Sequence, residues 1–167
     1  MIFATVGTHE DPFNRLLQAL DDLAASGKLG AEEIVCQSGY CDIEAPSVPC
    51  HTQLPFDDLQ ALMSDARVII THGGPASIMQ ALAHGKIPIV VPRQADFGEH
   101  VDNHQCRFAE KMSNRVLVVF NIGELEGLIV NYEKEVARFP ASDAGPDRAK
   151  SFAKKLDALC GALLSTD

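Results

Sequence analysis

Two glycine-containing turns carry residue types suited to binding a phosphorylated ligand. Gly7-Thr8 follows the first apolar run of the chain, and Gly73-Gly74 follows a later one. Glycine lets a backbone approach a ligand closely, and the helix expected after each turn offers free N–H groups and a positive dipole end. Thr8 and Ser77 add hydroxyl groups that can donate to phosphate oxygens. Anion binding is the chemistry that these turns predict.

The same turns also have a structural interpretation. The segment His72–Ser77 could be a tight strand-to-helix connection, and the hydroxyl residues could cap helices. A third polar segment, Asp102–Gln105, lies where a helix is expected to begin after a long loop. Asp102 or Asn103 suits the N-cap of that helix, whereas the amides of Asn103 and Gln105 suit a ribose or a base. Three such segments in one sheet favour a ligand cleft.

The possible metal ligands form weaker patterns. His100 and His104 would share a face if both were helical, but no third ligand is evident. The number of cysteines, five, is odd and they form no CxxC pair, so free thiols in a reducing cytoplasm are expected. A zinc site of uncommon spacing would use Cys36, Cys41, Cys50 and His51. We therefore expect no metal and no other cofactor.

Strands and helices are expected to alternate, which favours a parallel α/β sheet of about five or six strands. Asp11 is the expected N-cap of the first helix and Pro12 its first residue. The expected strands are Ile2–Val6, Glu33–Gln37, His51–Leu54, Val68–Thr71, Ile87–Val91 and Arg115–Val119. The later helices are expected at residues 56–63, 76–84, 102–112, 122–132 and 148–164.

Composition narrows the class of protein. The 167 residues suit one domain, and a net charge of −9 argues against nucleic acid as a partner, because phosphate-backbone binding needs a basic face. No apolar run approaches the ~20 residues of a membrane-spanning helix. The N-terminal segment is expected to be a first strand rather than a signal peptide.

Together these segments resemble the C-terminal, donor-binding half of GT-B glycosyltransferases of family 28. The resemblance covers roughly the first 120 residues and is carried by FATVGTHEDPFNRLLQAL, SDARVIITHGGPASIMQALAHGKIPIVVPR and DNHQ, in that order. The chain is most similar to single-domain members. These include the catalytic subunit of the two-subunit dolichol-linked GlcNAc transferase and bacterial capsule and exopolysaccharide transferase subunits.

The resemblance implies a Rossmann-like three-layer parallel sheet, one half of a GT-B enzyme, with a UDP-sugar at its carboxyl edge. Transfer would be inverting and would need no metal, because backbone N–H groups of the two turns would offset the charge of the leaving group. In related enzymes a carboxylate on the central helix binds the ribose, and the matching residue here is Gln80. The implied binding residues are Gly7, Thr8, His72, Gly73, Gly74, Ser77, Gln80, Asn103 and Gln105.

The resemblance also implies partners. Residues 1–138 would form the nucleotide-sugar-binding domain, 139–146 a linker, and 147–167 an amphipathic helix contacting a partner. That partner would be a membrane-anchored, acceptor-binding subunit, which would hold this chain at the cytoplasmic membrane face near a lipid-linked sugar acceptor. The catalytic residue is not assigned; the base would lie on the partner or be His9, for which a surface turn residue is the simpler interpretation. Gln80 supports an alternative, a non-catalytic nucleotide-binding or regulatory module.

Overall fold

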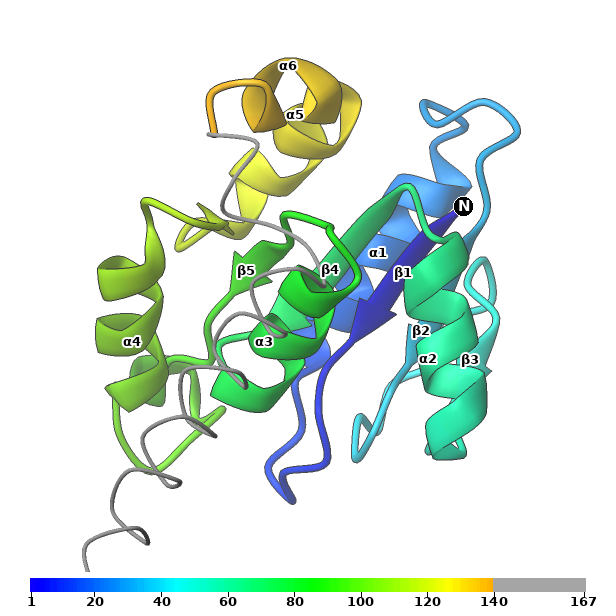
Figure 1. The fold of residues 1–167 in the computed structure, drawn as a ribbon. Helices are drawn as coiled ribbons and strands as arrows, with labels where there is room; N and C mark the ends of the chain where they lie inside the picture. Colours follow the sequence, from blue (N-terminus) through cyan, green and yellow to red (C-terminus); the bar gives the residue numbers. More distant parts are fainter. Residues whose placement is uncertain (140–167) are drawn as a thin grey trace, which may run out of the picture.

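The computed structural model describes residues 1–139 and contains a six-stranded, fully parallel sheet in the order β3-β2-β1-β4-β5-β6 (Figure 1). The strands are β1 Ile2–Thr5, β2 Ile34–Gln37, β3 Cys50–His51, β4 Val68–His72, β5 Ile89–Val91 and β6 Leu117–Val118. The α-helices are α1 Asn14–Ala25, α2 Phe56–Asp65, α3 Pro75–Ala83, α4 His104–Met112, α5 Leu125–Val130 and α6 Tyr132–Val136. Two 3₁₀ helices, η1 Ala95–Phe97 and η2 Ile122–Glu124, lie in the loops.

The sheet forms because its central strands are mostly apolar and are buried on both faces, with polar residues only at their carboxyl ends. β1 pairs with β2 on one side and with β4 on the other, with Ile2 opposite both Ile34 and Val68. This strand order is the one found in doubly wound, Rossmann-like folds. The predicted parallel α/β sheet is therefore confirmed.

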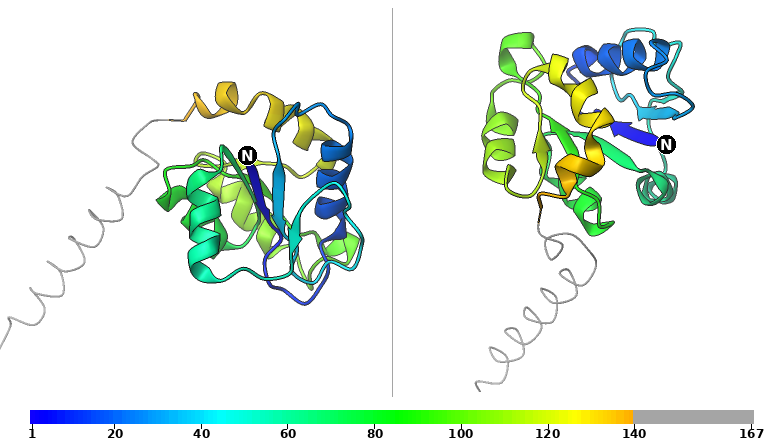
Figure 2. Two further views of the ribbon diagram at one scale, coloured as in Figure 1. Left: turned by 90° about the vertical axis from the view of Figure 1, so that its right-hand side faces the viewer. Right: turned by 90° about the horizontal axis from the view of Figure 1, so that it is seen from above.

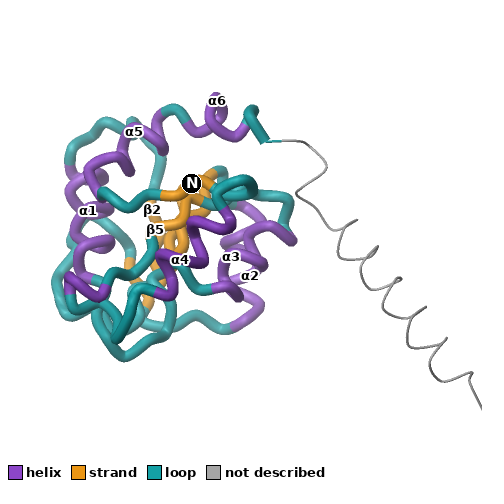
Figure 3. The backbone as a smooth tube through the Cα atoms, turned by 90° about the vertical axis from the view of Figure 1, so that its left-hand side faces the viewer, coloured by secondary structure: helices purple, strands orange, loops and turns teal. Residues whose placement is uncertain are grey.

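Helices cover both faces of the sheet, giving three layers (Figures 2 and 3). On one face, α1, α5 and the start of α6 pack against alternate residues of β1 and β4, such as Ile2 and Ile70. On the other face, α2 and α3 pack against Phe3 and Ile69, and α4 extends this layer over Val90. Each strand thus contributes its two faces to different cores.

Several element boundaries differ from the sequence predictions. α1 begins at Asn14 with Phe13 as its N-cap, so the predictions of Asp11 as N-cap and Pro12 as first residue are wrong. The backbone N–H of Asp11 donates instead to the His9 ring at 3.2 Å. The edge strand predicted at 51–54 is Cys50–His51. The single helix predicted over 122–132 is divided into η2, α5 and the start of α6. Asn131 lies between α5 and α6, and its side-chain amide donates to the Gly127 carbonyl at 2.8 Å. Gly127, within α5, is itself a poor helix former.

The helix predicted over 147–167, and all of the predicted linker except Phe139, lie outside the described residues. Within residues 1–139, no helix is long and apolar enough to cross a membrane.

Candidate functional site

A cavity of about 400 Å³ lies at the carboxyl ends of β1 and β4. Here the strand order reverses direction, and a ligand crevice opens at this point in doubly wound sheets. The lining residues come from the carboxyl ends of β1, β2 and β4, from the loops after β1 and β4, from α2 and α3, and from the first turn of α4. They are Thr5, Gly7, Thr8, His9, Gln37, Leu59, Met63, His72, Gly74, Pro75, Ala76, Ser77, Gln80 and Gln105.

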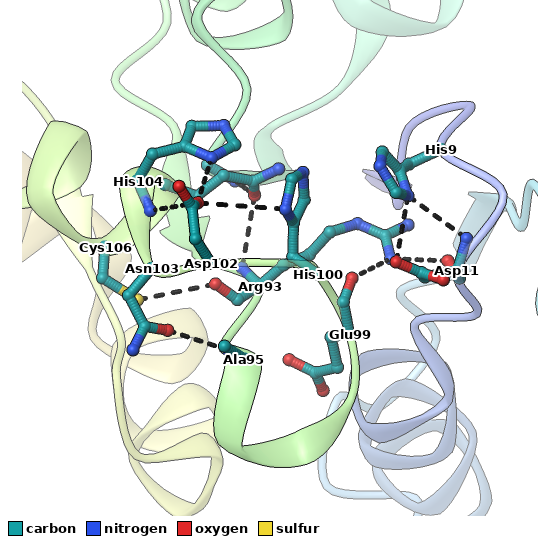
Figure 4. Close-up of polar contacts among 12 residues, drawn as sticks. His9, Asp11, Arg93, Ala95, Glu99, His100, Asp102, Asn103, His104 and Cys106 are labelled. Atoms are coloured by element: carbon teal, nitrogen blue, oxygen red, sulfur yellow. Dashed lines mark hydrogen bonds and ion pairs between the residues drawn. The ribbon is translucent and has the colours of Figure 1, made fainter.

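Most of the residues predicted to bind the ligand line this cavity, and two do not. Gly73 is buried beneath it, where its N–H donates to Gln105 Oε1 at 3.0 Å. Asn103 lies outside it: its side-chain oxygen accepts the N–H of Ala95 at 2.8 Å and so closes the loop between β5 and α4 (Figure 4). The structure therefore gives Asn103 a loop-holding contact instead of a place in the cavity wall.

His72 organises the glycine turn. Its Nδ1 accepts the N–H of Gly74 at 3.0 Å, so the neutral ring carries its proton on Nε2. Nε2 lies 3.2 Å from Ser77 Oγ and donates to it. The hydroxyl hydrogen of Ser77 therefore stays available to donate into the cavity.

The glycines of both turns make room for neighbouring side chains. A Cβ on Gly7, which has a φ of +82°, would lie 2.5 Å from His72 Nε2, and a Cβ on Gly74 would collide with the same ring. A Cβ on Gly73 would lie 2.7 Å from Gln105 Cβ. The two glycine turns and the Asp102–Gln105 segment are therefore in direct contact with one another.

The available backbone donors differ from the sequence prediction. The amides of Gly73 and Gly74 are occupied by Gln105 and His72, and the amide of Gly7 donates to Thr5 Oγ1 at 3.3 Å. Pro75, the first residue of α3, has no N–H. The amides that the first turn of α3 leaves without a helical partner are those of Ala76 and Ser77, and both residues line the cavity.

The described lining of the cavity contains only two ionisable side chains, His9 and His72. Burial, with a further contribution from the positive charge of Arg93, lowers the pKa of His72 to about 4. His72 is therefore neutral at physiological pH. The cavity thus offers neutral donors and a helix N-terminus to an anion, and within residues 1–139 no carboxylate lines it to repel one.

Arg93, which sequence reasoning missed, ties the loops around the cavity together. Its side chain is fully buried, and its Nη1 donates to the carbonyls of Asp11 at 2.6 Å and Glu99 at 3.0 Å (Figure 4). Its Nη2 donates to the Val6 carbonyl at 2.9 Å, and the guanidinium lies 4.9 Å from the ring centre of Phe13. A lone arginine after a buried strand was the available signal, but it does not reveal which carbonyls are reached.

The chain matches the glycosyltransferase family 28 C-terminal domain over residues 1–157. It belongs to this family. A family 28 origin agrees with the fold and with the place of the cavity.

Two curated proteins are similar to this chain in sequence. A UDP-N-acetylglucosamine–N-acetylmuramyl-(pentapeptide) pyrophosphoryl-undecaprenol N-acetylglucosamine transferase of Bdellovibrio bacteriovorus is 38% identical over 87 residues, which are 47% of this chain and 23% of the relative. The UDP-N-acetylglucosamine transferase subunit ALG13 of Yarrowia lipolytica is 41% identical over 56 residues, which are 34% of this chain and 26% of the relative. The matched region thus spans about a quarter of each relative.

Solved structures show the same fold. The glycosyltransferase of kitacinnamycin superposes with a TM-score of 0.57 at 21% identity, covering 93% of this chain and 43% of that one. The calicheamicin glycosyltransferase CalG4 gives a TM-score of 0.56 at 16% identity, covering 97% of this chain and 43% of that one. This family 28 chain therefore has the fold of one half of a GT-B glycosyltransferase.

Proposed function

We propose that this chain is the donor-binding catalytic subunit of a heteromeric glycosyltransferase that moves a sugar from a UDP-sugar to a lipid-linked acceptor. The observation that carries the proposal is the cavity at the β1–β4 switch point, with two unoccupied amides and the Ser77 hydroxyl at the N-terminus of α3. UDP-N-acetylglucosamine is the first donor to test, because both relatives are named as transferases of that sugar.

In this proposal the diphosphate lies against the first turn of α3. The amides of Ala76 and Ser77 and the Ser77 hydroxyl donate to its oxygens, and the helix dipole favours the negative charge. The hydrogen bonds from these donors strengthen as negative charge develops on the leaving UDP, so they stabilise the transition state more than the ground state. An inverting displacement needs, in addition, a base that takes the proton of the acceptor hydroxyl.

Gln80 is proposed to contact the ribose. It lies on α3 at the cavity wall, beside the glycine turn. Its amide can hydrogen-bond a diol, but it lacks the charge that strengthens such bonds to a carboxylate. The alternative function, a non-catalytic nucleotide-binding or regulatory module, is favoured by this residue alone.

The acceptor half is proposed to be a separate membrane-anchored subunit that brings this chain to the cytoplasmic face of the membrane. Support comes from the Yarrowia lipolytica relative, which is named as a subunit of a UDP-N-acetylglucosamine transferase. His9, half-buried at the cavity wall, is the candidate base within this chain, and the partner is the other source.

The test of donor binding is a melting-temperature titration of the purified chain with UDP, UDP-GlcNAc, UDP-glucose and UDP-galactose. A ligand at a hundred times its dissociation constant stabilises the folded state by about 2.7 kcal/mol. We expect UDP-GlcNAc to give the largest shift and Ser77→Ala to reduce it. Ser113→Ala, an exposed serine at the end of α4, is the matched control and leaves the shift unchanged.

The test of catalysis uses the chain co-expressed with its membrane subunit. Transfer of radiolabelled sugar into a lipid extract, lost in Ser77→Ala and kept in Ser113→Ala, would support the catalytic role. Donor binding without any transfer by the assembled pair would instead favour the regulatory module. The proposal fails if neither the isolated chain nor the pair binds any of the four nucleotides.

A further inference from the structure

A compact group of metal-ligand atoms lies in the loop between η1 and α4. His100, Asp102 and His104 each present a ligand atom, and these atoms all lie within 4.8 Å of one another (Figure 4). Asp102 Oδ1 is the common centre, 2.6 Å from His104 Nδ1 and 4.0 Å from His100 Nδ1. The sequence suggested only the two histidines and no third ligand. The loop conformation supplies that ligand, because it turns residues 100, 102 and 104 to the same side.

Part of this cluster has an ordinary structural explanation. Asp102 Oδ1 accepts the backbone N–H of His104 at 2.8 Å, which satisfies an amide at the start of α4. The same carboxylate contacts the His104 ring, and Arg107 approaches its other oxygen, Oδ2, at 3.7 Å. These contacts with the first residue of α4 therefore account for Asp102 and His104. They do not account for His100.

His100 is the observation that points to a ligand. Its side chain is only 9% exposed, and its Nδ1 is buried without a hydrogen-bond partner among the described residues. That atom faces Asp102 Oδ1. A buried ring nitrogen without a partner costs free energy, so such a group in a native structure calls for an unseen partner.

Hydrogen bonds on both sides of the cluster hold its backbone in place, which favours a metal site. Arg93 fixes the backbone at Glu99, directly before His100, and Asn103 bonds to Ala95 across the loop. The His9 ring packs against the His100 ring with centroids 4.4 Å apart. This stacking connects the cluster to the wall of the donor cavity.

We propose that His100, Asp102 and His104 bind a divalent transition-metal ion of the Zn²⁺ class beside the donor cavity. Two imidazole nitrogens and one carboxylate form a set that suits Zn²⁺ and similar ions and leaves a coordination position open. Zn–N and Zn–O bonds of about 2.0–2.2 Å place ligand atoms ~3.3 Å apart, so side-chain shifts of about 1 Å complete the site. The ion replaces the proton between Asp102 and His104 and satisfies the buried nitrogen of His100.

The experiment titrates Zn²⁺ into the full chain, stripped with a chelator and carrying no histidine tag, in competition with a chromophoric chelator. We expect a single high-affinity Zn²⁺ per chain. Asp102→Asn and His104→Ala each remove a ligand from a half-exposed position, so the fold survives, and each weakens binding by more than about tenfold. His51→Ala, an exposed histidine beside Cys50 on β3, is the matched control and leaves the affinity unchanged.

Cobalt substitution identifies the ligands independently. Co²⁺ bound to nitrogen and oxygen gives visible ligand-field bands without the thiolate charge-transfer band that Cys50 would produce. The inference is overturned if the chain binds no Zn²⁺, if both cluster variants bind as tightly as the natural chain, or if binding follows Cys50 and His51. No nucleotide is present in this titration, so its failure leaves the proposed donor site untouched.

Discussion

Lowering the pH is expected to destabilise the chain through His72. Burial and the nearby positive charge of Arg93 lower the pKa of this ring from 6.5 to about 4 in the folded state. Protonation would also place an N–H on Nδ1, the atom that accepts the Gly74 amide. His9 and His100 also lower the pKa of His72, by smaller amounts, through their positive charge.

The sign and size of the effect follow from proton linkage. Below pH 6.5 the unfolded chain binds a proton at His72, whereas the folded chain does not until about pH 4. The free energy of unfolding is therefore unaffected by this group above pH 6.5 and falls as the pH is lowered toward 4. With 1.36 kcal/mol for each unit of pKa, the loss between neutral pH and pH 5 is about 2 kcal/mol.

The assay is urea unfolding of the natural chain and of His72→Asn between pH 7.5 and pH 5. Asparagine keeps an acceptor for the Gly74 amide but does not titrate, and the other ionisable groups are common to both proteins. The natural chain should lose about 2 kcal/mol relative to the variant over this range. Parallel stability curves for the two proteins would refute the reasoning.

Two further predictions concern packing and charge. Gly73→Ala places a Cβ 2.7 Å from Gln105 Cβ and should cost about 1–3 kcal/mol in urea unfolding, whereas Gly127→Ala, with nothing within 4 Å, should stabilise α5 by about 0.5–1 kcal/mol. Equal effects would contradict this account. Glu99→Gln breaks a buried ion pair of 2.8 Å with Arg15 of α1 and should lower the free energy of unfolding by about 3 kcal/mol. Glu126→Gln breaks an exposed pair with Lys28 and should lower it by less than about 1 kcal/mol. A loss of similar size in both variants would show that burial does not set the difference.

The fold was predictable because its signals are local and agree with one another. Apolar strands such as Ile89–Val91, glycine turns and amphipathic helices follow each other in an order that favours a parallel α/β sheet. The position of β1 at the centre of the sheet cannot be predicted from the sequence of any single segment. It follows from pairing choices between segments that lie far apart in the sequence, which periodicity does not contain.

The boundaries were harder to predict because they depend on contacts outside the local pattern. Asp11 and Pro12 are a good start for a helix in isolation. In the structure, the Asp11 carbonyl accepts from Arg93 and its N–H donates to His9, so the backbone is used by the loop and α1 begins two residues after Pro12. A tertiary contact thus overrides a local preference.

The detail of the site depends on side-chain directions that spacing does not contain. Asn103 and Gln105 have similar chemistry and lie in one short segment, but only Gln105 reaches the cavity wall, because α4 begins between them. Its Oε1 accepts from Gly73 and from Arg93. The sequence grouped these polar residues correctly in space, and the structure separates a loop contact from a cavity contact.

The glycines show why a motif can suggest the right place for an incomplete reason. Gly7 and Gly74 were expected to let the backbone approach a phosphate, but the space they leave is filled by the His72 ring. That ring donates to Ser77 and frees the Ser77 hydroxyl to face the cavity. An added methyl at either glycine would therefore displace His72 before it met any ligand. The glycines shape the proposed anion site through a side chain, and Ala76 and Ser77, two and three residues after Gly74, supply its backbone donors.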